Sequence, residues 1–339
     1  MNIRNEGIIL EKTEREFENQ AVLNPSCIEK DGIIHMFYRA VRTGNNSTIG
    51  YCQLDHNNTV IYRRPTPLIV PEHDYERHGI EDPRVVFFEG LYYLFYTAYD
   101  GKNALVAYAT SPDLIHFTKR GLLSPRILYK DAVPFLKKSH IPGKYFWYAD
   151  HYQELAGKSI LLWEKDAFIF PRRVNGNIVF VHRIMPGIQL MFIKDFSEIS
   201  RMHWEQYLST LSDHLLMDSQ YWFETRKIGG SCPPIETDHG WLFIYHAVED
   251  NIKGRIYHAC AALLDRDNPL KVLARLHEPL FSPTEGWEKQ GDVSNVVFPS
   301  SALERNGRIF IYYGAADSRI GLRSVAVDDL LTELLKNKI

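Results

Sequence analysis

Neither sign of charge dominates this sequence. Its 39 lysine and arginine residues balance 42 aspartate and glutamate residues, which leaves a formal net charge of −3 and an isoelectric point near 6.5. Such a balance offers no electrostatic attraction for a nucleic acid or an anionic membrane surface. The sequence also lacks an apolar run of membrane-spanning length, and residues 1–6 lack the basic and apolar regions of a signal peptide. We therefore expect a cytoplasmic protein with no nucleic-acid partner and no membrane partner.

Cysteine is scarce as well. The four cysteines lie far apart and none belongs to a Cys-x-x-Cys pair, so the sequence gives no basis for a zinc site or a disulfide framework. We expect free, buried thiols in a reducing compartment, with no metal and no organic cofactor. The cysteines are Cys27, Cys52, Cys232 and Cys260.

Aromatic residues, in contrast, are abundant and recur in a pattern. The 19 Tyr, 18 Phe and 6 Trp make up 13% of the chain, a composition that suits β-strands. Five times, a short turn containing glycine leads into an apolar, aromatic-rich strand that ends in a polar residue. The five copies are Asp31-Gly32 before residues 33–40, Glu89-Gly90 before 91–98, Asn175-Gly176 before 177–183, His239-Gly240 before 241–247 and Asn306-Gly307 before 308–315.

The spacing of this repeat predicts the fold. Neighbouring copies are about 50 to 90 residues apart, which is enough for one four-stranded sheet each. Five such sheets in a radial arrangement predict an all-β, five-bladed propeller over residues 20–325, within a single domain of residues 1–339. A pair of β-sandwiches is the alternative, but five similar units fit it poorly.

Helices are expected in few places. Residues 204–218 carry apolar residues at mixed helical spacing, and residues 325–337 predict a short C-terminal helix. Residues 133–163 are interpreted as an insertion between the second and third repeats. The sequence GKYFWYADH within it resembles the repeated strand, so a sixth blade is an alternative. We expect instead an extra hairpin attached to the third blade.

Polar residues at matching positions of the repeats are candidates for a shared site. The innermost strands of a propeller line its central channel, so these side chains would converge there. The alternative is that each residue merely ends a strand in solvent. The residues in question are Arg39, Arg183, His246 and Asp317.

Two adjacent carboxylates precede the second repeat, in the segment of residues 78–84. Glu81 and Asp82 are followed by Pro83, which fixes its own φ and disfavours helix at the residue before it. Neighbouring side chains of an extended strand point in opposite directions. We therefore expect one carboxylate to face the channel and the other to be held by Arg84 or by backbone donors. Asp-Pro turns are also common without any catalytic role.

Four cationic or potentially cationic groups suggest a second site. They lie in three separate motifs, at positions expected to be the ends of blades. Arginine offers a fork for an oxyanion and lysine a point charge, so their convergence would create an anion site without a glycine-rich loop. For any single one of them, a solvated surface charge is the alternative. The four groups are Lys165, Arg183, Lys227 and His246.

These segments together resemble glycoside hydrolase family 130, the inverting β-mannoside phosphorylases and their β-mannosidase relatives. The resemblance extends from about residue 24 to residue 317, and it rests on an ordered series of short motifs. They are NPS (24–26), YRA (38–40), GIEDPR (79–84), YTAYDG (96–101), KDAFIFP (165–171), HR (182–183), KIGGSCPPIET (227–237), GWLFIYHAV (240–248), VVFPSS (296–301) and IYYGAAD (311–317).

The resemblance implies a five-bladed propeller and a mechanism. Asp82 would be the sole catalytic carboxylate, and its proton would reach the glycosidic oxygen through the 3-hydroxyl of the bound mannose. Phosphate would attack C1 from the opposite face and yield α-mannose 1-phosphate. Phosphate is already nucleophilic, so such an enzyme needs cations to hold it rather than a carboxylate base.

The resemblance also implies roles for individual residues. By motif, the phosphate ligands would be Lys165, Arg183, Lys227 and His246. The mannose ligands would be Asn46, Ser47 and Asp317, to which we add Arg39. The expected function is therefore an inverting β-mannoside phosphorylase acting on a manno-oligosaccharide, with inorganic phosphate as co-substrate.

Three alternatives remain at this point. The first is a β-mannosidase of the same family, and the second is a five-bladed furanosidase with carboxylates such as Asp100, Asp150 and Glu236. The third is a sugar-binding propeller without catalysis. The sequence leaves the linkage, the acceptor sugar and homo-oligomerisation open.

Overall fold

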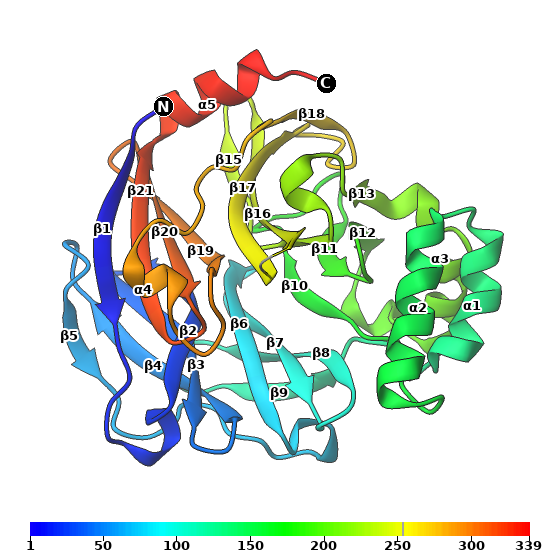
Figure 1. The fold of residues 1–339 in the computed structure, drawn as a ribbon, viewed down its shortest axis with the longest axis horizontal. Coiled ribbons are helices and arrows are strands. Elements are labelled where there is room, and N and C mark those ends of the chain that lie inside the picture. Colours follow the sequence, from blue (N-terminus) through cyan, green and yellow to red (C-terminus); the bar gives the residue numbers. More distant parts are fainter. Residues whose placement is uncertain (253) are drawn as a thin grey trace.

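The computed structural model describes residues 1–252 and 254–339. Strands supply most of its regular structure and helices a small part, which confirms the predicted all-β character at that level. Figure 1 shows the sheets grouped around the middle of the molecule, with most of the helical segments at one side. All four cysteines are free and buried.

The strands of the described residues form four hydrogen-bonded sheets, of which the largest has eight strands. That sheet consists of two antiparallel groups of four, joined by a single parallel residue pair between Ser47 and Gly79. The first group contains β2 (Ala21–Lys30), β3 (Ile33–Arg42), β4 (Asn46–Leu54) and β5 (Val60–Arg63), and the second contains β6 (Gly79–Phe88), β7 (Leu91–Tyr99), β8 (Ala104–Ser111) and β9 (Thr118–Leu122).

The other three sheets are antiparallel, and the last of them joins the two ends of the chain. Its outer strand β1 (Ile3–Leu10) pairs with β21 (Arg319–Ala326), as the blue and red strands of Figure 1 show. The third group contains β10 (Lys165–Ile169), β11 (Ile178–Arg183), β12 (Ile188–Ile193) and β13 (Leu215–Met217). The fourth contains β14 (Lys227–Gly230), β15 (Ile235–Thr237), β16 (Gly240–Asn251), β17 (Gly254–Leu264) and β18 (Val272–Arg275), and the fifth adds β19 (Val297–Arg305) and β20 (Arg308–Ala315) to β1 and β21.

The predicted repeat is confirmed as local structure. Its five copies form β3, β7, β11, β16 and β20, and each follows a tight turn. At four of these turns two successive residues have positive φ, as at Asp31 (52°) and Gly32 (75°). At the fourth copy Gly240 has a φ of 128°. Glycine adopts this conformation without a Cβ clash, and Asn and Asp tolerate it better than most residues.

The insertion is helical, so the prediction of an extra hairpin was wrong. Residues 133–163 lie largely in α1 (Tyr129–Lys138) and α2 (Gly143–Ala156). Helix α2 buries Tyr145, Tyr148, Ala149 and Tyr152, a spacing of three and four residues that places them on one helical face. The aromatic content of this segment suggested a strand, whereas its periodicity is that of a helix.

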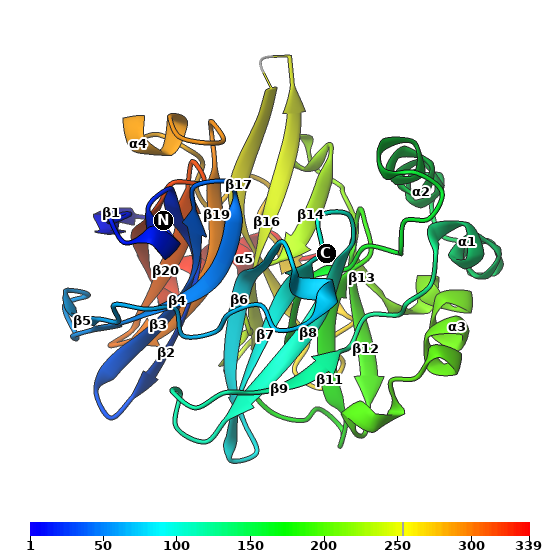
Figure 2. The same ribbon diagram turned by 90° about the horizontal axis from the view of Figure 1, so that it is seen from below.

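The remaining helices agree with the prediction in part. Helix α3 (Arg201–Ser209) ends earlier than expected, because a 3₁₀ turn and strand β13 occupy residues 211–217. Helix α5 (Val327–Lys336) confirms the predicted C-terminal helix, and the single turn α4 (Gly286–Lys289) was not predicted. Figure 2 shows α1, α2 and α3 together on one side of the molecule. Within the described residues no helix has the length and apolar character needed to cross a membrane.

A buried glutamate recurs with the strand groups. In four groups it accepts a hydrogen bond from a tyrosine of the repeated strand and pairs with an arginine or lysine of the same group. Tyr96 Oη donates to Glu76 at 2.7 Å, for example, and Lys119 Nζ lies 2.6 Å from the same carboxylate. The other sets are Glu18 with Tyr38 and Arg63, Glu224 with Tyr245 and Arg275, and Glu288 with Tyr313 and Arg323.

The third group replaces tyrosine with histidine at this position. His182 Nδ1 lies 2.7 Å from the buried carboxylate of Glu164, and His182 Nε2 lies 2.7 Å from the hydroxyl of Tyr207 in α3. His182, the partner of Glu164, is thus also bound to helix α3 through Tyr207. The third group is therefore the one whose anchor extends to the helical side of the molecule.

Candidate active site

Three strands are interrupted at matching positions, and these interruptions create the site. The pairing register shifts between Leu23 and Ser26 in β2, between Glu81 and Arg84 in β6, and between Lys165 and Phe168 in β10. At each bulge one polar residue takes a positive φ: Asn24 (48°), Asp82 (52°) and Asp166 (56°). A bulge of this kind redirects a side chain out of the regular alternation of the strand.

Asp82 and Glu81 contact the same guanidinium group. Arg39 Nη2 lies 2.8 Å from Glu81 Oε1, and Arg39 Nη1 lies 3.8 Å from Asp82 Oδ1. Asn24 Nδ2 also donates to Asp82 Oδ1 at 2.8 Å. The prediction that the two carboxylates point apart was wrong, because the argument holds for a regular strand and Asp82 sits in a bulge. We call Asn24, Arg39, Glu81, Asp82 and Asp317 the acidic half of the site.

Arg84 has a different role from the predicted one. It is buried, and its Nη1 donates to the backbone carbonyls of Asp82 (3.1 Å) and Pro83 (2.9 Å) rather than to a carboxylate. Its Nε and Nη2 have no hydrogen-bond partner among the described residues. Arg84 therefore fixes the backbone of the bulge and adds a positive charge behind Asp82.

Asp317 interacts electrostatically with the acidic half from the turn between β20 and β21. Burial raises the pKa of Asp317 to about 6, the charge of Arg39 opposes this rise, and the charge of Asp82 adds to it. Although burial lowers the pKa of Arg39, two carboxylates of the β6 bulge and one of the β20–β21 turn raise it, and of these three only the two of β6 lie within ion-pair distance of Arg39.

Arg183, His246 and Asp166 form the centre of a second cluster. Arg183 Nη1 lies 2.8 Å from Asp166 Oδ2 and 3.2 Å from His246 Nε2, and His246 Nε2 lies 3.7 Å from Asp166 Oδ2. Burial lowers the pKa of His246 well below its usual value, and the charges of Arg183, Lys227 and Arg84 lower it further. His246 is therefore neutral near pH 7. We call Asp166, Arg183, Lys227 and His246 the cationic half of the site.

Asp166 was missed by the sequence analysis. It occupies the bulge of β10, just as Asn24 and Asp82 occupy those of β2 and β6. A comparison of the residues that precede each repeated strand would have aligned these three polar residues.

Lys165 joins the two halves. Its Nζ lies 3.0 Å from Glu81 Oε2, while the other oxygen of Glu81 contacts Arg39. Burial lowers the pKa of Lys165, but the nearby charges of Glu81 and Asp82 outweigh burial and raise the pKa above its ordinary value. Lys165 is thus a charged ammonium group that already has a carboxylate partner.

Lys227 is the cation without such a partner. Within residues 1–252 and 254–339 it has no carboxylate at salt-bridge distance, and its Nζ lies 5.9 Å from the centre of the Tyr257 ring. Burial lowers the pKa of Lys227 well below its usual value, Arg183 adds to this effect, and Asp166 opposes it. An anion placed between Lys227 and Arg183 would relieve their repulsion.

Asn46 and Ser47 lie beside a different hollow. They begin β4 and line a cavity of about 490 Å³ whose wall also contains Arg42 and Arg77. Asn46 Nδ2 donates to the carbonyl of Gly44 at 3.2 Å, whereas the buried Ser47 Oγ has no hydrogen-bond partner among the described residues. No hydrogen bond within the described part of the chain connects either residue to Asp82. Ser47 nevertheless pairs with Gly79, three residues before Asp82.

The carboxylates suggested for a furanosidase are scattered. Asp100 caps the turn after β7 by accepting the amide hydrogens of Lys102 and Asn103. Asp150 is exposed on α2, and Glu236 of β15 pairs with Arg172. The geometry therefore offers no three-carboxylate site built from these residues.

The chain is similar to known proteins over nearly its whole length. A family model described as beta-1,4-mannooligosaccharide phosphorylase matches residues 3–336. The chain is 30% identical over 335 residues to a 1,2-beta-oligomannan phosphorylase of Thermoanaerobacter sp. (strain X514), with 95% of this chain and 96% of that protein covered. It is 32% identical over 338 residues to a beta-1,2-mannobiose phosphorylase of the same strain, with 94% and 95% covered.

A solved structure shares the fold. The beta-1,2-mannobiose phosphorylase from Listeria innocua, in its complex with beta-1,2-mannobiose, aligns with a TM-score of 0.74 at 20% sequence identity. The alignment covers 98% of this chain and 99% of the other.

Proposed function

The chain belongs to glycoside hydrolase family 130, and on that premise we propose that it is an inverting β-mannoside phosphorylase. It cleaves a β-linked manno-oligosaccharide with inorganic phosphate and releases α-mannose 1-phosphate. The observation that carries this proposal is the surplus of positive charge beside Asp82. Lys227 and Arg84 have no carboxylate at salt-bridge distance within the described residues, so the site has room in its charge balance for an anion.

Asp82 is the general acid of this proposal. Its proton passes through the 3-hydroxyl of the bound mannose to the glycosidic oxygen, and the bond between C1 and that oxygen breaks. The hydrogen bond from Asn24 and the nearby Arg39 orient the carboxyl group. In this proposal Arg39 and Asp317 bind the same mannose, and Asn46 and Ser47 bind it from the cavity that they line.

The cationic half holds the phosphate. Arg183, Lys227 and the neutral His246 offer donors to its oxygens, and Lys165 adds a charge from the side of Glu81. One phosphate oxygen attacks C1 from the face opposite the leaving oxygen. Preorganised cations supply the positioning and charge stabilisation that such a transfer needs.

The direct test is the phosphate dependence of cleavage. We expect β-mannobiose to give mannose 1-phosphate in millimolar phosphate and almost no free mannose in phosphate-free buffer. Release of mannose at full rate without phosphate would replace this proposal with the β-mannosidase. The assay should compare β-1,2- and β-1,4-mannobiose. We favour the β-1,2 linkage, because the two relatives that match almost the whole chain are named for β-1,2-linked substrates.

We propose further that the five strand groups are the blades of one propeller within a single domain. Two observations support this: a buried glutamate accompanies each group, and β1 completes the sheet of β21. A strand from the N-terminal part that completes a sheet of the C-terminal part can close a ring of blades. A cytoplasmic location is also proposed, on the sequence evidence alone.

A further inference from the structure

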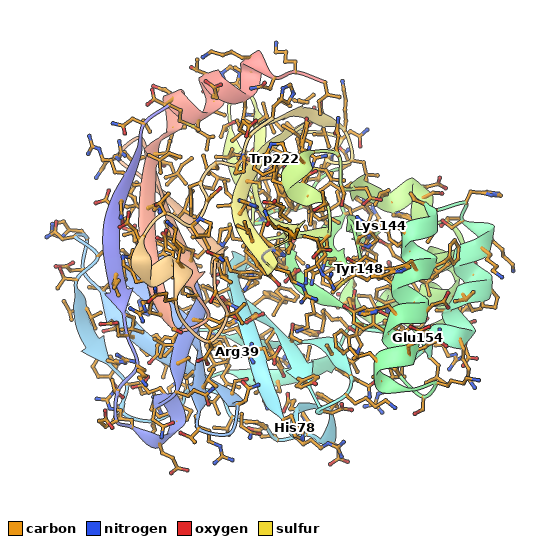
Figure 3. The ribbon with its side chains drawn as sticks, in the orientation of Figure 1. Arg39, His78, Lys144, Tyr148, Glu154 and Trp222 are labelled. Atoms are coloured by element: carbon orange, nitrogen blue, oxygen red, sulfur yellow. The ribbon has the colours of Figure 1, made fainter. Side chains whose placement is uncertain are left out.

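Helix α2 of the insertion attaches to the backbone on both sides of the cationic half. Its residues Lys144, Tyr148 and Tyr152 are four apart and so share one helical face. Figure 3 shows the labelled Lys144 and Tyr148 on the side of α2 that faces the strands.

Two of these residues hold the segment directly before Lys227. Tyr148 Oη donates to the backbone carbonyl of Arg226 at 2.7 Å, and Lys144 Nζ donates to the carbonyl of Thr225 at 2.9 Å. The Tyr148 side chain is buried, so water does not compete freely for this hydrogen bond. Lys227 follows Arg226 as the first residue of β14.

The same helix face holds the loop that follows Arg183. Tyr152 Oη donates to Met185 Sδ at 3.0 Å. Two residues along from Met185, the backbone amide of Gly187 lies close to Tyr145 Oη. The two held segments are also joined to each other, since the amide of Ile228 donates to the carbonyl of Pro186 at 3.0 Å.

We propose that α2 is a brace that fixes the distance between Arg183 and Lys227, with Tyr148 as its main positioning residue. Two like charges on neighbouring strand ends repel each other when no anion lies between them. A strand end held only by its own sheet can yield to that repulsion. The contacts from α2 resist it, so that the free enzyme presents a phosphate site of the right width. This inference rests on the proposed function and extends it to the insertion.

The test is Tyr148→Phe in the full chain, with both substrates varied. Loss of one buried hydrogen bond to a carbonyl should raise the phosphate KM about 2- to 10-fold. The mannoside KM and the kcat at saturating phosphate should stay within about twofold of the parent enzyme, since a positioning residue for phosphate acts on its binding. Lys144→Met, which removes the neighbouring contact from a partly exposed side chain, should act in the same direction with a smaller effect.

Tyr313→Phe is the matched control. It removes a buried tyrosine hydroxyl bonded to Glu288, so it should lower the melting temperature and leave the phosphate KM unchanged. If Tyr148→Phe behaves as this control does, α2 is merely structural and the brace is refuted. An equal change in both KM values would also refute it, because α2 would then line the sugar site.

Calorimetry with inorganic phosphate separates this inference from the proposed function. Cleavage by the parent enzyme without phosphate would overturn the phosphorylase, yet the phosphate Kd of the parent and of Tyr148→Phe could still be compared. A weaker Kd in the variant supports the brace, and an equal Kd refutes it. If the parent enzyme binds no phosphate, both proposals fall.

Discussion

The two halves of the site differ in how their charges are matched. In the acidic half each carboxylate of the β6 bulge contacts Arg39 or Lys165, and Asn24 donates to Asp82. In the cationic half a single carboxylate, Asp166, serves Arg183 and approaches His246, while Lys227 has none at salt-bridge distance in the described chain. Similar bulges in β2, β6 and β10 therefore contribute to sites with opposite charge balance. In the proposed mechanism the acidic half delivers the proton and the cationic half receives the phosphate.

The largest change in activity is expected when the acidic proton of Asp82 is removed. Asp82→Asn keeps the shape and the hydrogen bond acceptor but has no acidic proton, so kcat should fall about 10²- to 10⁴-fold. Phosphate binding, measured by calorimetry, should change little because the cationic half is intact. Near-normal turnover of the variant would exclude Asp82 as the acid.

The converse change removes the arginine of the cationic half. Arg183→Ala loses charged hydrogen bonds to phosphate and leaves Asp166 without its main partner, so the phosphate KM should rise about 10- to 100-fold. Steady-state kinetics at several phosphate concentrations measure this. Arg183→Lys keeps the charge and should fall between the parent and the alanine variant. An unchanged phosphate KM in Arg183→Ala would contradict the assignment.

Two glycines allow a matched comparison of the halves. A Cβ at Gly314 would clash with Asn24 Oδ1, and one at Gly229 would clash with Asp166 Oδ2. Overpacking of this kind costs about 1–3 kcal/mol. We expect Gly314→Ala to act mainly on kcat and Gly229→Ala mainly on the phosphate KM. The same kinetic response in both variants would mean that the halves do not act separately.

The buried carboxyl group of Asp317 should make the stability of the protein depend modestly on pH. Burial raises the pKa of Asp317 to about 6, so the folded state favours the protonated acid. The stability from this group is complete below about pH 4 and is lost as the pH rises through 6. Asp317→Asn should therefore gain about 1–2 kcal/mol relative to the parent between pH 4.5 and pH 7.5. Chemical denaturation at both pH values measures it, and parallel curves would refute the role of Asp317.

The sequence predicts those parts of the fold that depend on local chemistry. The turn residues Asp31-Gly32 and Asn306-Gly307, each followed by an aromatic strand, identify the second strand of a group because positive φ is a property of the turn itself. The interpretation of 133–163 failed because aromatic content was weighed above the helical spacing of Tyr145, Tyr148 and Tyr152. Composition indicates which residues are buried, whereas their spacing indicates whether they lie on a helix or on a strand.

The candidate site could be predicted in its members but not in its connections. Arg183 and His246 lie in contact, and Lys165 is the strand partner of Arg183. The carboxylates that pair with these groups, Glu81 and Asp166, were not assigned to them. The bulges at Asn24, Asp82 and Asp166 become visible only when the segments that precede the repeated strands are compared with one another. The buried glutamates were missed for a related reason, since Glu18 and Arg63 are 45 residues apart in sequence.

The pairing of β1 with β21 also bears on how the protein is made. During synthesis β1 leaves the ribosome before β21, its partner, which follows more than 300 residues later. At about 5–20 residues per second the delay is roughly 15 to 60 s. Over that interval β1 must remain an unpaired strand, and the nascent chain cannot complete its last sheet. The emergence of β21, rather than of any earlier strand, therefore sets the earliest moment at which the fifth strand group can be completed.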